Sequence, residues 1–261
     1  HGRIYRVFPA ESAPRAWPRL SGSAPADLVN YLEHPNGWVR DTAQQQLVQS
    51  GEGKAAGGLR RLVRASGVAL GRLHALCALD GIGQLDASTL EIALKDSQPG
   101  VRRQAVRLSA TLAPSLLDGL EDSDPAVRLE LAVSARGGAD IARFAGDKDP
   151  WIAAAAMSSL DSKNVISALE SSLESPELFA RLTGQAVAWK KGAEAAELLG
   201  RYLPGAKTGD KLRLTSAWLE KGDSRSAPAA VLDVVEVAEA MAFDRLVAGE
   251  LRVAAIGLLN R

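Results

Sequence analysis

The sequence has a single cysteine, Cys77, so no disulfide bond can form within the chain. It also has no C-x-x-C-H motif, which excludes covalent haem attachment. A single cysteine does not fix the compartment, because larger exported proteins need no disulfide bonds. The sequence therefore predicts no cofactor in this chain.

Aromatic residues are also few, and the sequence has neither an excess of basic charge nor a long apolar run. Aromatics make up 5% of the residues, so the core must consist mainly of alanine, leucine and valine, which suit closely packed helices. The 31 basic and 31 acidic residues balance, whereas a duplex-binding protein usually has a basic excess. No apolar run approaches the roughly 18 residues that span a bilayer. We therefore expect neither nucleic-acid binding nor membrane insertion.

Motifs that carry chemistry are missing as well. Neither G-x-x-x-x-G-K-[ST] nor G-x-S-x-G occurs, and the three histidines lie far apart in the sequence. His74 and Cys77 are one helical turn apart, as a nucleophile and its base would be, but the leucines around them favour burial of both. We predict no catalytic, cofactor-binding or metal-ligating residue, and no enzyme activity in this chain.

Two further stretches have a structural and a functional interpretation. The segment 120–125, LEDSDP, has the composition of a calcium loop but lacks its full ligand series, which favours helix capping. Gly81 and Gly83 could belong to a phosphate-binding loop. Because they lie between two helical patterns, a turn is the better interpretation.

One phrase recurs along the chain. It reads EHPNGWVRDTAQQQL at 33–47, DSQPGVRRQAVRL at 96–108, DSDPAVRLELAVSA at 122–135 and DKDPWIAAAAMSSL at 147–160. Aligned on the Val-Arg step, eight anchors 25 to 39 residues apart can be assigned: Val39, Gly71, Val101, Val127, Ile152, Leu178, Leu212 and Leu251. A small or apolar residue follows each anchor by four positions. This spacing is typical of a solenoid of repeats.

Each phrase has the features of a helix start. Asp124, Asp149 and Ser175 each precede a proline, an arrangement in which the side chain caps a helix and the proline takes its first position. Before the phrases lie shorter helical patterns, such as those at 87–96, 114–122 and 163–174. We therefore predict an all-α fold, an α-solenoid of about eight short HEAT-like helix-turn-helix repeats.

The repeat positions also supply the candidate partner-binding residues. The repeated arginine either forms an inter-repeat ladder, bridging to acidic turn residues such as Asp96 or Asp122, or lines the concave face for an acidic partner. The tryptophan before the anchor either covers the seam to the next repeat or is an exposed contact residue. The candidates are Trp38, Arg40, Arg102, Arg128 and Trp151.

The two ends differ from the repeats. Residues 1–25 combine a strand-like segment, 1–8, with a proline-rich linker, and we interpret the strand as the remnant of an upstream domain. The solenoid is predicted over 26–261, with its first helix beginning near Ala26. A longer apolar helix is predicted at 229–243. The final apolar helix, 249–260, lacks a polar capping repeat, and such an end is normally covered.

Three segments carry a resemblance to a known family. Residues 1–8, HGRIYRVF, resemble the closing strand of a β-propeller of the sorbosone/glucose dehydrogenase type. Residues 32–47 and 71–86 resemble the HEAT segment that follows it in large secreted bacterial proteins described as membrane-bound dehydrogenases, which end in a c-type cytochrome domain. The resemblance covers about residues 1–135 and implies an exported parent oxidoreductase, without any catalytic residue in this chain.

The expected function follows from the repeats and the resemblance together. We expect a non-catalytic scaffold, the spacer between the dehydrogenase propeller and the cytochrome, whose partners are those flanking domains or another protein on the concave face. A stand-alone protein-binding module is the first alternative. A lyase or a DNA-binding enzyme built on HEAT repeats is the second. The oligomeric state is left open.

Overall fold

The computed structural model describes residues 7, 9–12, 18–51, 53–222 and 227–260. Over these residues the chain is all-helical, with no strand, which confirms the predicted all-α class. The strand-like segment 1–8 lies, apart from Val7, outside the described residues. The chain divides into two compact units, residues 1–108 and 109–261, and the division falls inside one helix, α6.

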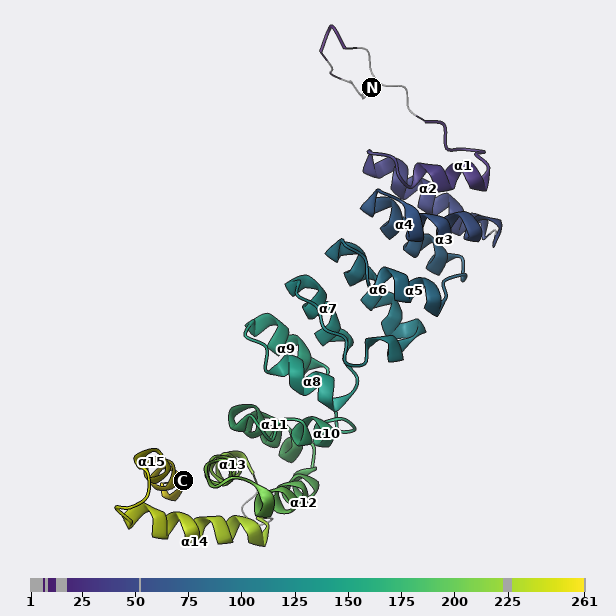
Figure 1. Cartoon of the computed structure of the whole chain (residues 1–261). Helices are drawn as coiled ribbons and strands as arrows, with labels where there is room; N and C mark the ends of the chain where they lie inside the picture. Colours follow the sequence, from purple (N-terminus) through teal and green to yellow (C-terminus); the bar gives the residue numbers. More distant parts are fainter. Residues whose placement is uncertain (1–6, 8, 13–17, 52, 223–226, 261) are drawn as a thin grey trace, which may run out of the picture. The chain divides into compact units, whose positions relative to one another are not determined.

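The first unit contains six α-helices and one 3₁₀ turn in its described residues (Figure 1). They are α1 Pro25–Tyr31, α2 Gly37–Ser50, η1 Gly53–Ala55, α3 Ala56–Ala65, α4 Ala69–Gly81, α5 Ala87–Ala93 and α6 Pro99–Leu112. Helices adjacent in sequence pack as pairs, α1 with α2 and α3 with α4. Contacts also join α2 to α4 and α3 to α5. The first helices of consecutive pairs therefore lie side by side, and so do the second helices of the first two pairs.

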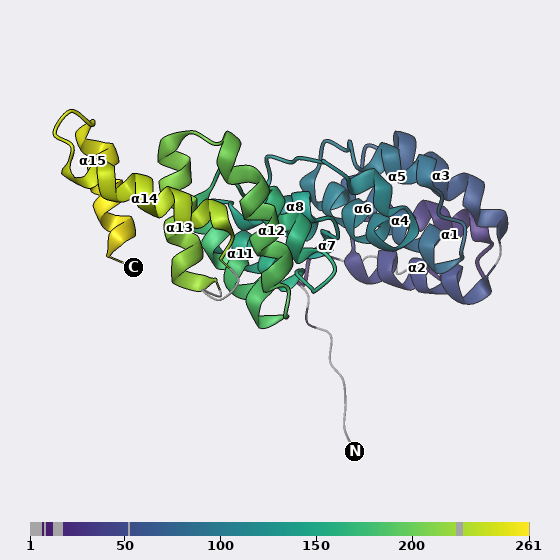
Figure 2. The same ribbon diagram turned by 90° about the horizontal axis from the view of Figure 1, so that it is seen from below.

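The second unit continues the same alternation over its described residues. Its elements are η2 Pro114–Leu117, α7 Pro125–Ser134, α8 Gly138–Ala145, α9 Pro150–Ser158, α10 Val165–Glu170, α11 Pro176–Ala188, α12 Gly192–Tyr202, η3 Leu203–Gly205, α13 Thr208–Lys221, α14 Ala229–Phe243 and α15 Gly249–Leu259. Contacts join α7 to α9, α11 to α13 and α13 to α15 in one row, and α8 to α10, α10 to α12 and α12 to α14 in the other. In both views α14 runs beside α13 and α15 (Figures 1 and 2).

The core has the composition that the sequence predicts. Nearly all of its buried side chains are alanine, leucine or valine, for example Val39, Ala43, Val101 and Ala105. Short helices of this kind are marginal in water, so their stability comes from burying these faces against neighbouring helices. Each buried leucine or valine contributes about 1.5–3 kcal/mol relative to an exposed one.

Helix starts follow the sequence signals at most of the expected places. The Asp124 carboxylate accepts hydrogen bonds from the backbone N–H groups of Ala126 and Val127, and the Asp149 carboxylate accepts one from Trp151. These bonds confirm capping as the role of both aspartates. Ser175 was expected to cap in the same way, but its side chain makes no cap hydrogen bond.

The prediction of a helix at 114–122 is wrong. Only the 3₁₀ turn Pro114–Leu117 forms there. Asp118 is extended with ψ 118°, and Gly119 adopts φ +68°, a left-handed conformation that ends helical geometry and favours glycine. The helix pair that ends with α7 therefore lacks a first α-helix, and the 3₁₀ turn η2 takes its place.

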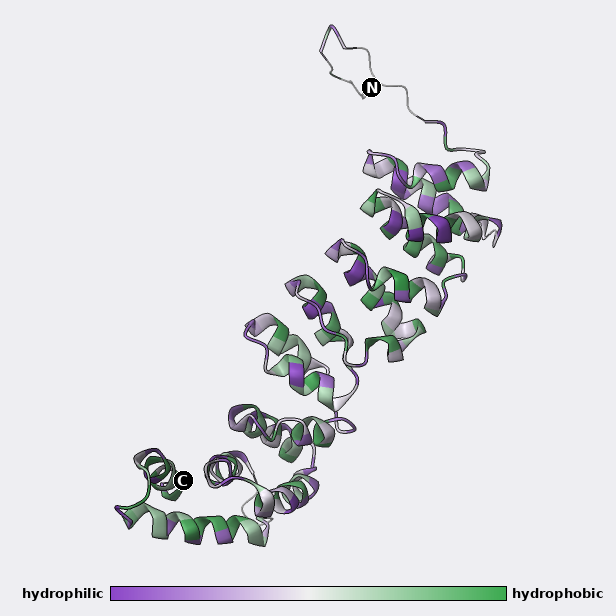
Figure 3. Ribbon diagram, viewed as in Figure 1, coloured by the Kyte–Doolittle hydropathy of each residue, from purple (hydrophilic) through white to green (hydrophobic). Residues whose placement is uncertain are grey.

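The last helices leave apolar side chains in solvent. Both α14 and α15 are apolar along most of their length (Figure 3). Val253 is 71% and Ile256 is 44% exposed on α15, and Phe243 is 85% exposed at the end of α14. Apolar side chains of both helices are therefore exposed in the described part of the chain.

Candidate functional site

The five candidate partner-binding residues all lie in the first turn of the second helix of a pair. Trp38 and Arg40 are on α2 and Arg102 is on α6, in the first unit. Arg128 is on α7 and Trp151 is on α9, in the second unit. The contacts of each side chain show whether it is available to a partner.

The repeated arginine anchors the turn that precedes its own helix. One guanidinium nitrogen of Arg40 donates to the carbonyl of His34 at 2.7 Å, and Arg72 does the same to Ser66 at 2.7 Å. Arg102 reaches the carbonyl of Asp96 at 2.8 Å. In all three cases the acceptor lies six residues upstream, so the arginine closes the turn between the two helices of a pair.

The same arginine also reaches the turn of the following pair. Arg72 forms a bidentate pair with Asp96, from Nε to Oδ2 at 2.6 Å and from the terminal nitrogen to Oδ1 at 2.7 Å. Arg128 Nε donates to Asp147 Oδ2 at 3.0 Å. Each carboxylate in turn accepts a backbone N–H of its own turn, from Gln98 and Asp149 respectively. The ladder interpretation is therefore confirmed for Arg72 and Arg128.

The ladder shifts the pKa of its carboxyl groups. Burial disfavours the charged form of Asp96, but the Arg72 hydrogen bonds, the Gln98 N–H and the charges of Arg72 and Arg102 outweigh it, so the pKa of Asp96 is lowered. For Asp147 the backbone N–H of Asp149 is the largest cause of a lowered pKa, and Arg128 adds to it. Both aspartates are held ionised as structural acceptors.

A comparable link joins the first helices of two consecutive pairs. Arg60 on α3 donates to Asp86 at 2.9 Å and to the carbonyl of Gln84 at 2.7 Å. Asp86 is the N-cap of α5, where it accepts hydrogen bonds from Thr89 and Ser88 that lower its pKa. Arginine therefore cross-links both rows of helices within the first unit.

The tryptophans are more exposed than a seam-covering side chain would be. Trp151 is 78% and Trp38 is 59% exposed. Of the two interpretations of the tryptophan position, exposure fits the contact residue and not the packed seam. An exposed indole ring offers a large rigid apolar surface with one hydrogen-bond donor, the chemistry that interface residues favour.

Replacing Trp151 by alanine tests this conclusion. We expect the free energy of unfolding to change by less than about 0.5 kcal/mol, because so exposed a side chain buries little area. A tryptophan that packs a seam would cost about 3–5 kcal/mol on truncation. Urea melts of the variant and the parent chain decide between the two values.

The His74 and Cys77 pair is not arranged for catalysis. The His74 ring is largely buried between α4 and α2, where its Nδ1 lies 2.7 Å from the side-chain oxygen of Gln44. Its Nε2 lies 3.9 Å from an oxygen of Asp41. Burial raises the pKa of the Cys77 thiol, the nearby Asp80 adds to the rise, and no hydrogen bond joins Cys77 to His74 among the described residues. Packing is therefore the better interpretation of both side chains.

Burial of His74 makes stability depend on pH. Desolvation and then the charge of Arg40 lower the pKa of His74, while Asp41 opposes the shift. A lowered folded-state pKa means that stability is full above the unfolded pKa, near 6.5, and declines as the pH falls through that value. We expect His74→Gln, which keeps a hydrogen-bonding side chain, to reduce this decline in denaturant melts between pH 7.5 and 5. An unchanged pH dependence in that variant would contradict the assignment.

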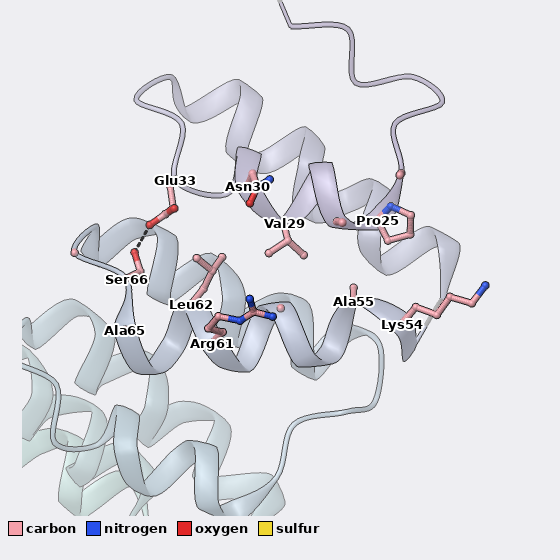
Figure 4. A pocket seen from close by; sticks show the side chains of 14 residues that line it. Pro25, Val29, Asn30, Glu33, Lys54, Ala55, Arg61, Leu62, Ala65 and Ser66 are labelled. Carbon is pink, nitrogen blue, oxygen red and sulfur yellow. Dashed lines mark hydrogen bonds between the residues drawn. The ribbon is translucent and has the colours of Figure 1, made fainter.

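A groove lies between α1 and α3 in the first unit (Figure 4). Its volume is about 720 Å³. It lies between the first helices of two consecutive pairs, and its lining reaches Ser66, whose carbonyl accepts the Arg72 hydrogen bond. Fourteen residues line it: Ala24, Pro25, Ala26, Val29, Asn30, Glu33, Lys54, Ala55, Gly58, Arg61, Leu62, Ala65, Ser66 and Gly67.

Small side chains create the groove. The two helices approach closely where Val29 covers Gly58, at which an added Cβ would lie 3.3 Å from the valine. Beyond this contact the facing positions are alanines such as Ala26, Ala55 and Ala65, which leave the space between the helices unfilled. The floor therefore consists of helix backbone and the methyl groups of small side chains.

One end of the groove is closed by a hydrogen bond from the Ser66 hydroxyl to the Glu33 carboxylate (Figure 4). The Glu33 stem also passes over Gly71, where an added Cβ would lie 2.9 Å from Glu33 Cγ. This explains why the second repeat has glycine at the anchor position that other repeats fill with valine or isoleucine. The contact fixes Glu33 at the rim.

The sequence interpretation missed this groove. Its signals were the run of small residues at 55–58, AAGG, and the sequence RRLVR at 60–64, which brings three arginines to α3 without an acidic residue. Both features are visible in the sequence. The groove itself is not, because it forms only when α1 packs against α3.

Comparisons with known proteins add no assignment. No model of a known protein family matches the chain, and neither does any curated protein. Over the described residues, no three histidine, cysteine or acidic side chains are grouped as metal ligands would be. No helix in that part of the chain combines the length and apolar character that a bilayer crossing requires.

Proposed function

We propose that this chain is an α-solenoid of eight short HEAT-like repeats that acts as a non-catalytic scaffold for other proteins or domains. Fifteen described helices supply seven helix pairs, and the 3₁₀ turn η2 with α7 makes the eighth. In a solenoid each repeat contacts only its neighbours, so the array offers extended surfaces without an enclosed pocket.

The observation that carries the proposal is the position of the eight repeat anchors. Every anchor lies in the second helix of a pair, and seven of the eight are its third residue; Leu212 in α13 is the exception. The same arginine-to-turn contact recurs after the anchors Val39, Gly71 and Val101. A sequence period that coincides with a structural period in this way is characteristic of repeat architectures.

The more specific role rests on the resemblance of residues 1–135 alone. In that role the chain is the spacer between a dehydrogenase propeller and a c-type cytochrome in an exported oxidoreductase. The array then sets the distance between two functional domains and presents them with docking surfaces.

The spacer role is tested on the full-length product. The coding sequence on both sides is read, and the product is stained for covalent haem. An upstream propeller and a stained downstream domain with C-x-x-C-H support the role. A start codon directly before His1 and a stop codon directly after Arg261 reject it, and leave the stand-alone binding module as the function.

A stand-alone protein-binding module is favoured by a separate observation, the exposure of Trp38 and Trp151. It is tested with the partner once one is isolated, by replacing each tryptophan separately with serine. A loss of affinity of tenfold or more in either variant supports that tryptophan as a contact residue, since contact residues of this type cost at least about 2 kcal/mol when truncated.

A further inference from the structure

We infer that the groove between α1 and α3 binds an acidic amphipathic helix of a partner protein. The inference rests on the proposed function, because it names the chemistry of a partner for the scaffold. It places the partner on the first helices of the first two pairs, whereas the tryptophans and the ladder arginines lie on second helices.

The shape of the groove fits a helix. It lies along α3, whose ten residues extend for about 15 Å, the length of nearly three helical turns. The lining between the two helices contains valine, leucine, alanine and glycine, a surface that accepts a row of apolar side chains at i, i+3, i+4 and i+7. A small ligand would need walls on more sides to bury most of its surface.

The charge at the rim selects the sign of the partner. Arg61 lines the groove from α3, is exposed, and makes no hydrogen bond or ion pair with any residue that the structure describes. Lys54 also lines the groove, at the opposite end from Glu33 (Figure 4). Glu33, the one acidic residue in the lining, is engaged by the Ser66 hydroxyl. An exposed arginine without a partner among the described residues, beside an apolar floor, fits apolar residues flanked by carboxylates.

The direct test uses a fluorescent peptide of about 14 residues, with leucine at i, i+3, i+4 and i+7 and glutamate on the flanks. Fluorescence anisotropy with the full chain measures binding. We expect binding that weakens with added salt. A scrambled peptide of the same composition and a peptide with lysine for glutamate should bind at least about tenfold more weakly, because each lacks one of the two matched features.

Variants of the protein locate the site. Arg61→Glu should weaken binding about tenfold, since it places like charges in contact. Arg64→Glu is the matched control, an equally exposed arginine on the same helix outside the groove lining, and should change affinity less than about twofold. Ala26→Trp, at an exposed lining position, should block binding by filling the groove and leave the circular dichroism spectrum unchanged.

Three results would overturn the inference. They are no binding of the acidic peptide up to about 1 mM, equal effects of Arg61→Glu and Arg64→Glu, or displacement of the peptide by a small dicarboxylate, which would make the groove an anion site. The groove and the proposed function are separated by a further result. If flanking domains or a partner still bind the chain when Ala26→Trp fills the groove, the scaffold stands and only the groove is rejected as their binding site.

Discussion

Replacing Arg72 by alanine is expected to lower the free energy of unfolding by about 3 kcal/mol. The Arg72 and Asp96 side chains are only 11% and 8% exposed, so the substitution leaves a buried carboxylate without its bidentate partner. It also frees the carbonyl of Ser66, which closes the turn before α4. Urea denaturation of the variant and the parent chain at pH 7 measures the loss.

The matched control is Arg64→Ala, which removes an exposed arginine and should change stability by less than about 0.5 kcal/mol. A double-mutant cycle with Asp96→Ala isolates the pair, because the aspartate substitution should cost little more once Arg72 is absent. Additive losses would show that the two side chains act independently and would contradict the ladder.

Acid adds a second signature to the same pair. The pKa of Asp96 is lowered in the folded state, so its contribution to stability is full above the ordinary value of 3.8 and is lost as the pH falls through the lower folded value. The Arg72→Ala variant should lose less stability than the parent chain over that acidic range, because the main cause of the lowered pKa is gone.

Gly138→Ala is expected to destabilise the second unit by about 3 kcal/mol or more. Gly138 is buried at the start of α8, and an added Cβ would overlap the backbone of Ser167 and Ala168 on α10. Backbone atoms cannot move aside as the end of a flexible side chain can, so α8 and α10 must separate. Thermal and urea melts of the variant measure the cost.

Gly137→Ala is the matched control one residue earlier. An added Cβ there meets nothing within 4 Å, and the residue has φ −78°, which alanine adopts without strain. We expect a change within about 1 kcal/mol, which reflects the weaker N-cap preference of alanine. Equal losses for the two variants would mean that helix capping, and not the close approach of α8 and α10, explains the glycine.

The features that the sequence predicts well are local. A proline after Asp124 or Asp149 specifies a cap and a first helical position, and the apolar period after it specifies the buried face. These signals lie within one helix. The all-α class and most of the helix starts followed from them, whereas the ladder was one of two interpretations of the repeated arginine.

The features that were missed depend on one residue or on contacts between distant segments. At 114–122 the apolar spacing was helical, but the conformation of Gly119 ended the helix after one turn. The groove arises because α1, around Val29, meets the small residues of α3, nearly thirty positions later. No local pattern specifies how closely two such helices approach, so neither the groove nor the exposed cation at Arg61 could be derived from the sequence.

The central proposal is that this chain is a solenoid of repeats, and small-angle X-ray scattering tests it most directly. A compact domain of 261 residues has a radius of gyration of about 18 Å. Eight stacked helix pairs, each advancing the array by about 8–10 Å, predict a radius of gyration clearly above that value and an elongated distance distribution. A radius of gyration near 18 Å for the monomer would contradict the solenoid.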